Sequence, residues 1–189
     1  MRPKEFSRNG VLEKCILLFW KEGFNGTGIQ KIVDQTNVNR YSLYQEFGNK
    51  EGILLASLEL YEKRHINWEV LSQSLSIQEL LYKFYSSFFN PSKSNNHPIG
   101  CYIASMTMEL RETNEMQLYF NTYLGLLKDK FEQLLHEKST LNIAKLKVMA
   151  QQLTTLYCIS MGMYVIFSQK EAEKRIQSNL NLITKCLNK

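Results

Sequence analysis

The sequence is poor in the residues that interrupt helices. Its 189 residues include three prolines and nine glycines, so a mostly helical chain is possible. Strand patterns, internal repeats and low-complexity tracts are also missing. Apolar residues nevertheless make up 44% of the chain, with ten Tyr and ten Phe, which suffices for a substantial core and argues against disorder. We therefore expect an all-α fold.

No pair of cysteines has the C-x-x-C spacing of a zinc site or a redox pair. The four cysteines are Cys15, Cys101, Cys158 and Cys186. Their even number leaves disulfides open, but a chain of this length folds without them.

Signal-peptide and membrane-spanning patterns are also missing. The first ten residues are charged, and no apolar stretch like that of a signal peptide follows them. The most apolar run, residues 153–167, is interrupted by Thr154, Thr155 and Ser160 and is shorter than the roughly 20 apolar residues that span a bilayer. We expect a cytoplasmic protein without membrane contact. Its net charge of +5 and pI of about 8.9 are compatible with a polyanionic partner.

Sequence signatures of common enzymes are missing as well. There is no G-x-S-x-G, no H-E-x-x-H, no phosphate loop and no glycine-rich dinucleotide turn. The three histidines, at 65, 97 and 136, share no metal-ligand spacing. A catalytic carboxylate pair stays open, although no residue points to one. We expect no enzyme, no cofactor and no metal site.

What the chain does contain is a series of helices with recognisable ends. Apolar residues recur at helical spacing over about 5–23, where Gly23 is a helix stop. Thr27 and Gln30 form a capping-box pattern that opens a short helix. Asn39 caps a third helix after a tight turn, and Asn49 caps a longer one over about 50–71. The first 50 residues therefore predict a helix-turn-helix domain.

The remainder predicts a second helical region. Ser76 to Glu79 is a capping box that opens a helix to about Phe89, and residues 90–98 form a loop. Helices are expected after Pro98, over 114–138, over 142–167 and from a further capping box at Ser168. We expect a three-helix DNA-binding domain over 1–49 and a helical ligand-binding and dimerisation domain over 50–189, with a connecting helix from about 50.

The third helix, residues 39–46, is short and polar, with only Leu43 and Phe47 to bury. A recognition helix presents such side chains to base edges in the major groove. Arg40 suits guanine and Gln45 suits adenine, whereas tyrosine hydroxyls reach phosphates. Thr27 and Lys50 flank the unit at helix starts, which favour phosphate. The candidate DNA-binding residues are Thr27, Arg40, Tyr41, Ser42, Tyr44, Gln45 and Lys50. The same side chains also suit a solvated surface.

Residues 11–55 resemble the DNA-binding domain of the TetR/AcrR family of bacterial transcriptional regulators, without gaps. The string LYxxFGNKEGIL is the most specific part of the match. The matching residues are Leu18-Phe19, Gly23-Phe24, Thr27, Ile29, Ile32-Val33, Thr36-Asn37-Val38, Leu43-Tyr44, Phe47, Lys50-Glu51 and Leu54. The resemblance implies a homodimeric repressor that binds a palindromic operator in double-stranded DNA. It also implies that the repressor leaves the operator when a small-molecule or electrophile inducer binds the C-terminal domain.

Glu46 departs from the family pattern, in which many members use a His at this place on phosphate. A carboxylate would be repelled by phosphate, so we expect no DNA contact from Glu46. This residue is the best support for the alternative, a helical interaction module that no longer binds DNA. Arg40, Tyr44 and Lys50 argue against that alternative.

The family's C-terminal domains enclose a ligand cavity, and aromatic or methionine side chains are its candidate lining here. They are Trp68, Phe84, Phe88, Tyr102, Met106, Tyr119, Tyr123, Tyr157 and Met161. Each one singly is more often a core residue.

Cys101 is a further candidate for ligand sensing. A helix start and His97 nearby favour a reactive thiolate. The stretch GCYIASMTMEL resembles a TetR subgroup, some of whose members sense electrophiles or oxidants through that cysteine. The competing and commoner role is a buried packing residue.

We expect the last two helices to form the dimer interface. The helix over 142–167 is too apolar to be exposed on both sides, and Gly162 permits close helix approach. Two such helices from each chain would form a four-helix bundle, and a twofold dimer reads a palindromic site.

Overall fold

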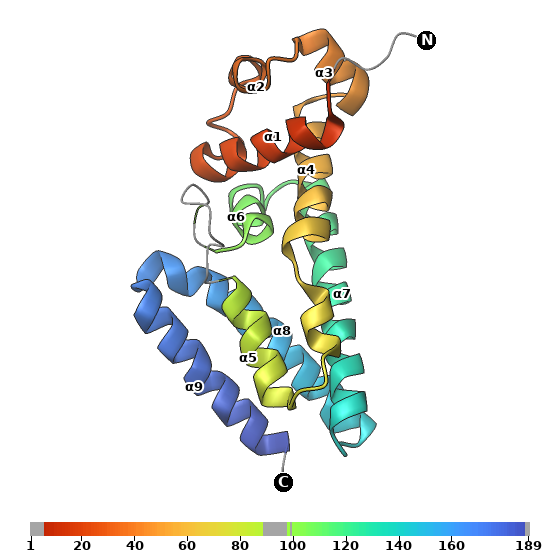
Figure 1. Ribbon diagram of the computed structural model, residues 1–189, viewed down its shortest axis with the longest axis vertical. Coiled ribbons are helices and arrows are strands. Elements are labelled where there is room, and N and C mark those ends of the chain that lie inside the picture. The colour runs from red at the N-terminus through yellow and green to blue at the C-terminus, as the bar shows by residue number, and fades with distance from the viewer. Residues whose placement is uncertain (1–5, 89–97, 99, 188–189) are drawn as a thin grey trace. The chain divides into compact units, whose positions relative to one another are not determined.

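The computed structural model describes residues 6–88, 98 and 100–187, leaving aside the side chains of residues 65, 161, 162, 164–166 and 169 (Figure 1). The described residues form helices and connecting loops without a strand, so the all-α prediction is confirmed. Their helices are α1 (Arg8–Glu22), α2 (Ile29–Thr36), α3 (Arg40–Phe47), α4 (Lys50–His65), α5 (Ile77–Ser87), α6 (Tyr102–Glu109), α7 (Asn114–Lys138), α8 (Ile143–Ile166) and α9 (Gln169–Leu187), with a 3-10 helix η1 (Trp68–Ser72) between α4 and α5.

The described residues fall into two compact units. The first contains residues 6–66, 98 and 102–111, so α4 and α6 belong with the N-terminal helices. The second contains residues 67–88, 100–101 and 112–187. Within the described part of the chain, no helix is both long enough and apolar enough to cross a membrane.

The core of the first unit forms around α1. Leu12, Ile16 and Phe19 lie on one face of α1 and are fully buried, since apolar residues three or four positions apart share a helix face. This helix packs against α2, α4 and α6. It ends where predicted, at Gly23, whose φ of +77° is a conformation that favours glycine and whose N–H donates to the Phe19 carbonyl.

The predicted capping box at Thr27 is wrong. Gly28 occupies the N-cap position of α2, and no side chain caps the helix. The Thr27 hydroxyl instead turns back and donates to the Gly23 carbonyl at 2.7 Å, and the side chain is completely buried. Gln30 donates to Asp34 rather than to the cap.

The predicted caps of α3 and α4 are confirmed. The Asn39 side chain accepts from the Ser42 N–H, and the Asn49 side chain accepts from the Gly52 N–H. Asn37 ends α2 in the left-handed conformation with φ of +58°, which a short polar side chain tolerates. These local interactions fix the helix-turn-helix formed by α2 and α3.

Two predicted boundaries differ from the structure. The helix predicted over 50–71 ends at His65, and Ile66 is extended. The break lets Ile66, Val70 and Leu71 all be buried, with η1 packing on α5 and α7. The helix expected directly after Pro98 begins only at Tyr102. The φ of +109° at Gly100 is incompatible with an α-helix.

The second unit packs α5, α7, α8 and α9 together, and Figure 1 shows α5, α8 and α9 running side by side. The fully buried rings of Phe84, Tyr85 and Phe131 lie at its centre, and the Tyr85 hydroxyl donates to the Leu153 carbonyl.

The two capping boxes predicted in this unit differ in outcome. The box at Ser76 is confirmed, with Glu79 returning to the cap. At Ser168 the hydroxyl accepts the Glu171 N–H, but the Glu171 carboxylate pairs with Arg175.

Candidate DNA-binding interface

The side chains of α3 separate into an anchored face and an exposed face. Leu43 is completely buried, and the helix packs on α2 and α4. Arg40, Tyr41 and Gln45 are exposed, and Tyr41 keeps 73% of its surface open. Five predicted residues thus lie together on one short helix, namely Arg40, Tyr41, Ser42, Tyr44 and Gln45, with Ser42 and Tyr44 half-buried.

Two contacts within α3 orient its exposed side chains. The Gln45 side-chain amide donates to the Tyr41 hydroxyl at 2.9 Å. The Arg40 guanidinium lies 5.2 Å from the centre of the Tyr44 ring, a cation–π arrangement that favours one orientation of the guanidinium. Both pairs are separated by four residues, which places them on the same side of the helix. The candidate base-reading groups are therefore held before any partner binds.

Thr27 and Lys50 are engaged in packing instead of lying on the α3 surface. The Lys50 ammonium donates to the Phe24 and Thr27 carbonyls at 3.0 and 3.1 Å and lies 4.0 Å from the Phe24 ring centre. Together with the buried Thr27 hydroxyl, this interaction holds the loop between α1 and α2. The phosphate contacts expected of these two residues stay predictions.

Glu109 holds the same loop from α6, and the sequence analysis missed it. Its carboxylate oxygens accept the Phe24 and Asn25 N–H groups at 2.9 and 2.8 Å. A Cβ atom at Gly23 would lie 2.9 Å from a Glu109 oxygen, so the glycine also permits the close approach of the carboxylate. No local pattern in the sequence signals a contact across 85 positions.

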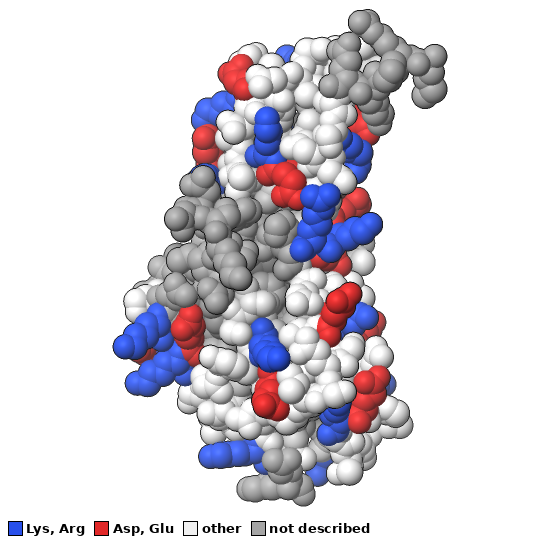
Figure 2. All heavy atoms as spheres, in the orientation of Figure 1, with Lys and Arg blue, Asp and Glu red and all other residues white. Residues whose placement is uncertain are grey.

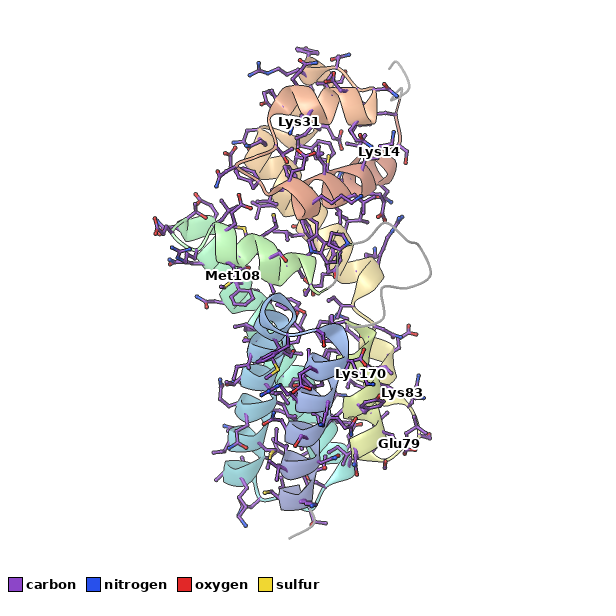
Figure 3. The ribbon with its side chains drawn as sticks, turned by 90° about the vertical axis from the view of Figure 1, so that its left-hand side faces the viewer. Lys14, Lys31, Glu79, Lys83, Met108 and Lys170 are labelled. Atoms are coloured by element: carbon purple, nitrogen blue, oxygen red, sulfur yellow. The ribbon has the colours of Figure 1, made fainter. Side chains whose placement is uncertain are left out.

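Charges of both signs are scattered over the face drawn in Figure 2, where Lys and Arg are interspersed with Asp and Glu over the described residues. Figure 3 shows Lys14 on α1 and Lys31 on α2 of the first unit. The Lys31 ammonium pairs with Glu22. Within the described residues, no group of three His, Cys, Asp or Glu side chains is arranged to hold a metal ion.

Several candidate ligand-binding residues form one aromatic cluster in the second unit. Trp68 stacks on Phe84 with ring centres 5.8 Å apart, and Phe88 meets Tyr157 edge-on at 5.3 Å. Tyr123 lies 6.3 Å from Trp68 and shares a 2.9 Å hydrogen bond with Tyr157. The cluster therefore combines aromatic rings with buried hydroxyl groups.

Two other candidates lie in the first unit instead of in this cluster. Tyr102 and Met106 are buried in the first unit, where Tyr102 packs on Trp20 and Tyr61 and shares a hydrogen bond with the Ser57 hydroxyl. Tyr119 is half-buried on α7. The Met161 side chain lies outside the described residues.

Cys101 lies in the cluster and is buried, with 2% of its surface exposed. Its sulfur accepts a hydrogen bond from the Tyr157 hydroxyl at 3.1 Å. Burial raises the pKa of Tyr157 well above its usual range, and the neighbouring Cys101 and Tyr123 add to that shift, so Tyr157 keeps the proton it donates. His97, which was expected to activate the thiol, lies outside the described residues. The geometry is that of a packed core cysteine.

The α2–α3 pair, with its anchored second helix and exposed polar face, defines a helix-turn-helix protein. Residues 12–57 match the model of the bacterial regulatory proteins of the tetR family. The HTH-type transcriptional repressor ComR of Escherichia coli (strain K12) is 31% identical over 105 residues, which cover 54% of this chain and 50% of ComR. The chain thus spans half the length of this relative.

Solved structures share the fold along nearly the whole chain. A TetR-family transcriptional regulator from Streptomyces coelicolor superposes with a TM-score of 0.82 at 17% identity, covering 96% of both chains. A cysteine mutant of the TetR-family regulator CifR, complexed with 26-base-pair operator DNA, gives a TM-score of 0.74 at 18% identity, covering 100% of this chain and 98% of CifR. At these identities the likeness shows the fold alone. The sequence match to the tetR family is confined to residues 12–57, and the rest of the chain shares the fold of solved TetR-family regulators.

Proposed function

We propose that this chain is a homodimeric, sequence-specific DNA-binding transcriptional repressor that an inducer releases from a palindromic operator. Residues 1–49 read the DNA, and residues 50–189 dimerise and sense the inducer. The observation that carries the proposal is the exposed polar face of α3, held by the buried Leu43. The match of residues 12–57 to the tetR family model supports it, as do the repressor name of ComR and the operator complex of CifR.

The side chains of α3 have two roles in recognition, since some read bases and others contact phosphates. Arg40 can donate two hydrogen bonds to guanine, and Gln45 can pair with adenine, each such pair giving about 1–3 kcal/mol of discrimination. The hydroxyls of Tyr41, Ser42 and Tyr44 suit backbone phosphates, which set the position of the protein without reading sequence. The Tyr41–Gln45 and Arg40–Tyr44 contacts reduce the conformational freedom that binding would otherwise remove.

The aromatic cluster of the second unit is the proposed inducer site. Its rings suit an apolar or aromatic small molecule, and the Tyr123 and Tyr157 hydroxyls supply polar groups that orient it. An electrophile would have to reach the buried Cys101 and break its hydrogen bond with Tyr157. Mass spectrometry after treatment with N-ethylmaleimide, comparing wild type with Cys101→Ser, tests this electrophile route directly. Modification at Cys101 that lowers operator affinity would support it.

The proposed dimer forms through exposed apolar residues on α8 and α9. Val148 and Ile159 on α8 are 59% and 51% exposed, and Leu182 on α9 is 62% exposed. A twofold dimer places such patches against their own copies. Ile159→Glu and Leu182→Glu should shift the protein toward a monomer in light-scattering chromatography. Met108→Glu, at a 72% exposed residue on α6 (Figure 3), is the matched control and should leave the mass unchanged.

Selection from random-sequence DNA with the purified protein tests the proposed function. Bound fragments are then measured by gel shift with competitor DNA over a series of salt concentrations. The proposal predicts a palindromic sequence whose binding weakens steeply as salt rises, because phosphate contacts release counterions. If selection enriches no sequence, the interaction-module alternative takes its place.

A further inference from the structure

Glu46 is the unusual residue of the α3 surface, since it places a carboxylate beside the proposed phosphate-binding side chains. Its side chain is only 16% exposed. A carboxylate oxygen lies 3.2 Å from the Arg8 Nε atom, so the negative charge is matched by a guanidinium from α1. The pair joins the first residue of α1 to the recognition helix.

Arg8 is held by a second contact with the same helix. Its guanidinium carbon lies 5.3 Å from the centre of the Phe47 ring. Two consecutive residues of α3, Glu46 and Phe47, thus contact the Arg8 guanidinium through a carboxylate and an aromatic ring, and a planar guanidinium can meet both at once. The Arg8 side chain is still 47% exposed. The guanidinium has five N–H donors, and the ion pair with Glu46 runs through Nε, so the outer nitrogens are able to bind an anion.

The position of Arg8 within α1 offers no advantage to that helix. A positive charge in the first turn opposes the helix dipole, and the N-terminus of α1 is already capped by the Ser7 hydroxyl. The contacts with α3 therefore account for the placement of Arg8 better than helix stability does.

We propose that Glu46 and Phe47 position Arg8 to bind a DNA backbone phosphate beside α3. The phosphate-binding group then comes from α1, and Glu46 is a positioning residue that never touches DNA. This inference rests on the proposed DNA-binding function. It gives Glu46 a constructive role in binding, in place of the repulsion expected from its charge alone.

The inference reverses the expected effect of removing the carboxylate. If Glu46 merely repelled phosphate, Glu46→Gln would tighten DNA binding, because the variant carries one negative charge fewer. If Glu46 holds Arg8, the same variant weakens binding, since the guanidinium loses its charged partner.

The experiment measures operator affinity over a salt series for wild type, Arg8→Gln, Arg8→Lys, Glu46→Gln and the double Gln variant. The operator is the one that wild type selects. Lys83→Gln on α5 in the second unit (Figure 3) is the charge control. Thermal unfolding checks that each variant is folded, and Glu46→Ala replaces any Glu46→Gln protein that is not.

We expect Arg8→Gln to bind about tenfold more weakly and to lower the slope of log affinity against log salt by about 0.9, the value for one phosphate contact. Arg8→Lys should regain the slope but only part of the affinity. Glu46→Gln should also bind more weakly, and the double variant should bind like Arg8→Gln alone. Lys83→Gln should match wild type in both quantities.

Tighter binding by Glu46→Gln would overturn the positioning role. An unchanged salt slope in Arg8→Gln would overturn the phosphate contact. Both results leave the proposed function standing, provided that wild type binds its selected operator. A wild-type protein that selects no DNA overturns the proposed function and this inference together.

Discussion

Glu109→Ala should destabilise the first unit measurably, because the carboxylate accepts two backbone N–H groups of the loop between α1 and α2. The Phe24 N–H is part-buried at 2.9 Å from its acceptor, whereas the Asn25 N–H is exposed at 2.8 Å. Water readily replaces the carboxylate at Asn25 after truncation, but less readily at Phe24. The two bonds therefore differ in what their loss costs.

The expected magnitude follows from that difference in burial. A net hydrogen bond is worth about 0.5–1.5 kcal/mol, and one to a charged group up to about 3 kcal/mol. We assign about 0.5 kcal/mol to the exposed bond and about 1.5 kcal/mol to the part-buried one. The sum of about 2 kcal/mol lowers Tm by roughly 4–8 °C in a chain of this length that unfolds as one unit.

Calorimetry and amide hydrogen exchange together test this prediction. Glu109→Gln keeps one acceptor oxygen and should lose about half as much stability. Glu59→Ala, at an exposed residue on α4 of the same unit, is the control and should change Tm little. The Phe24 amide should exchange faster in Glu109→Ala. A Tm equal to that of Glu59→Ala, with unchanged exchange at Phe24, would refute the reasoning.

Three further predictions concern the second unit and the thiols. Tyr157→Phe removes a buried hydroxyl from its two partners and should lower the free energy of unfolding in urea by about 1–2 kcal/mol; undiminished stability would contradict this. Hydrogen bonds from Ser76 lower the pKa of Glu79. The ionised carboxylate therefore stabilises the fold fully at pH values above the ordinary pKa of a glutamate, and this stabilisation is lost as the pH falls through the lowered pKa. Glu79→Gln should accordingly flatten the acid side of a stability–pH curve, and an identical curve would show that the bonds do not matter. Burial raises the pKa of Cys15 to about 12 whereas Cys186 is exposed, so iodoacetamide should label Cys186 in the folded protein and Cys15 only after unfolding, as peptide mass spectrometry would show.

Features set by neighbouring residues were predictable from the sequence. These features depend on residues within four positions of one another, and they are the side-chain caps at Asn39, Asn49 and Ser76 and the helix end at Gly23. The capping role predicted for Thr27 is wrong, although the contact that its hydroxyl makes is also local. Its hydroxyl has a competing acceptor in the Gly23 carbonyl, and a capping pattern does not reveal which partner a threonine takes.

Contacts between distant segments could not be predicted in this way. Lys50 lies at a helix start as expected, but no local pattern indicated that its ammonium donates to carbonyls 23 and 26 positions away. Glu109 and Arg8 reach their partners only after the helices have packed. Tyr102 was grouped with the ligand candidates by residue type, yet α6 places it against α1 and α4. Residue type and spacing indicate which face of a helix is buried, but not which neighbour covers it.

The central claim, that α3 reads DNA sequence, is tested most directly by repeating the random-sequence selection with Arg40→Ala. The structure leaves Arg40 exposed and stacked on Tyr44, so the substitution should leave the fold intact. The account predicts a selected sequence that matches that of wild type except at one position per half-site, where base preference falls by about 1–3 kcal/mol. A variant that selects the wild-type sequence with full preference at every position would contradict the account.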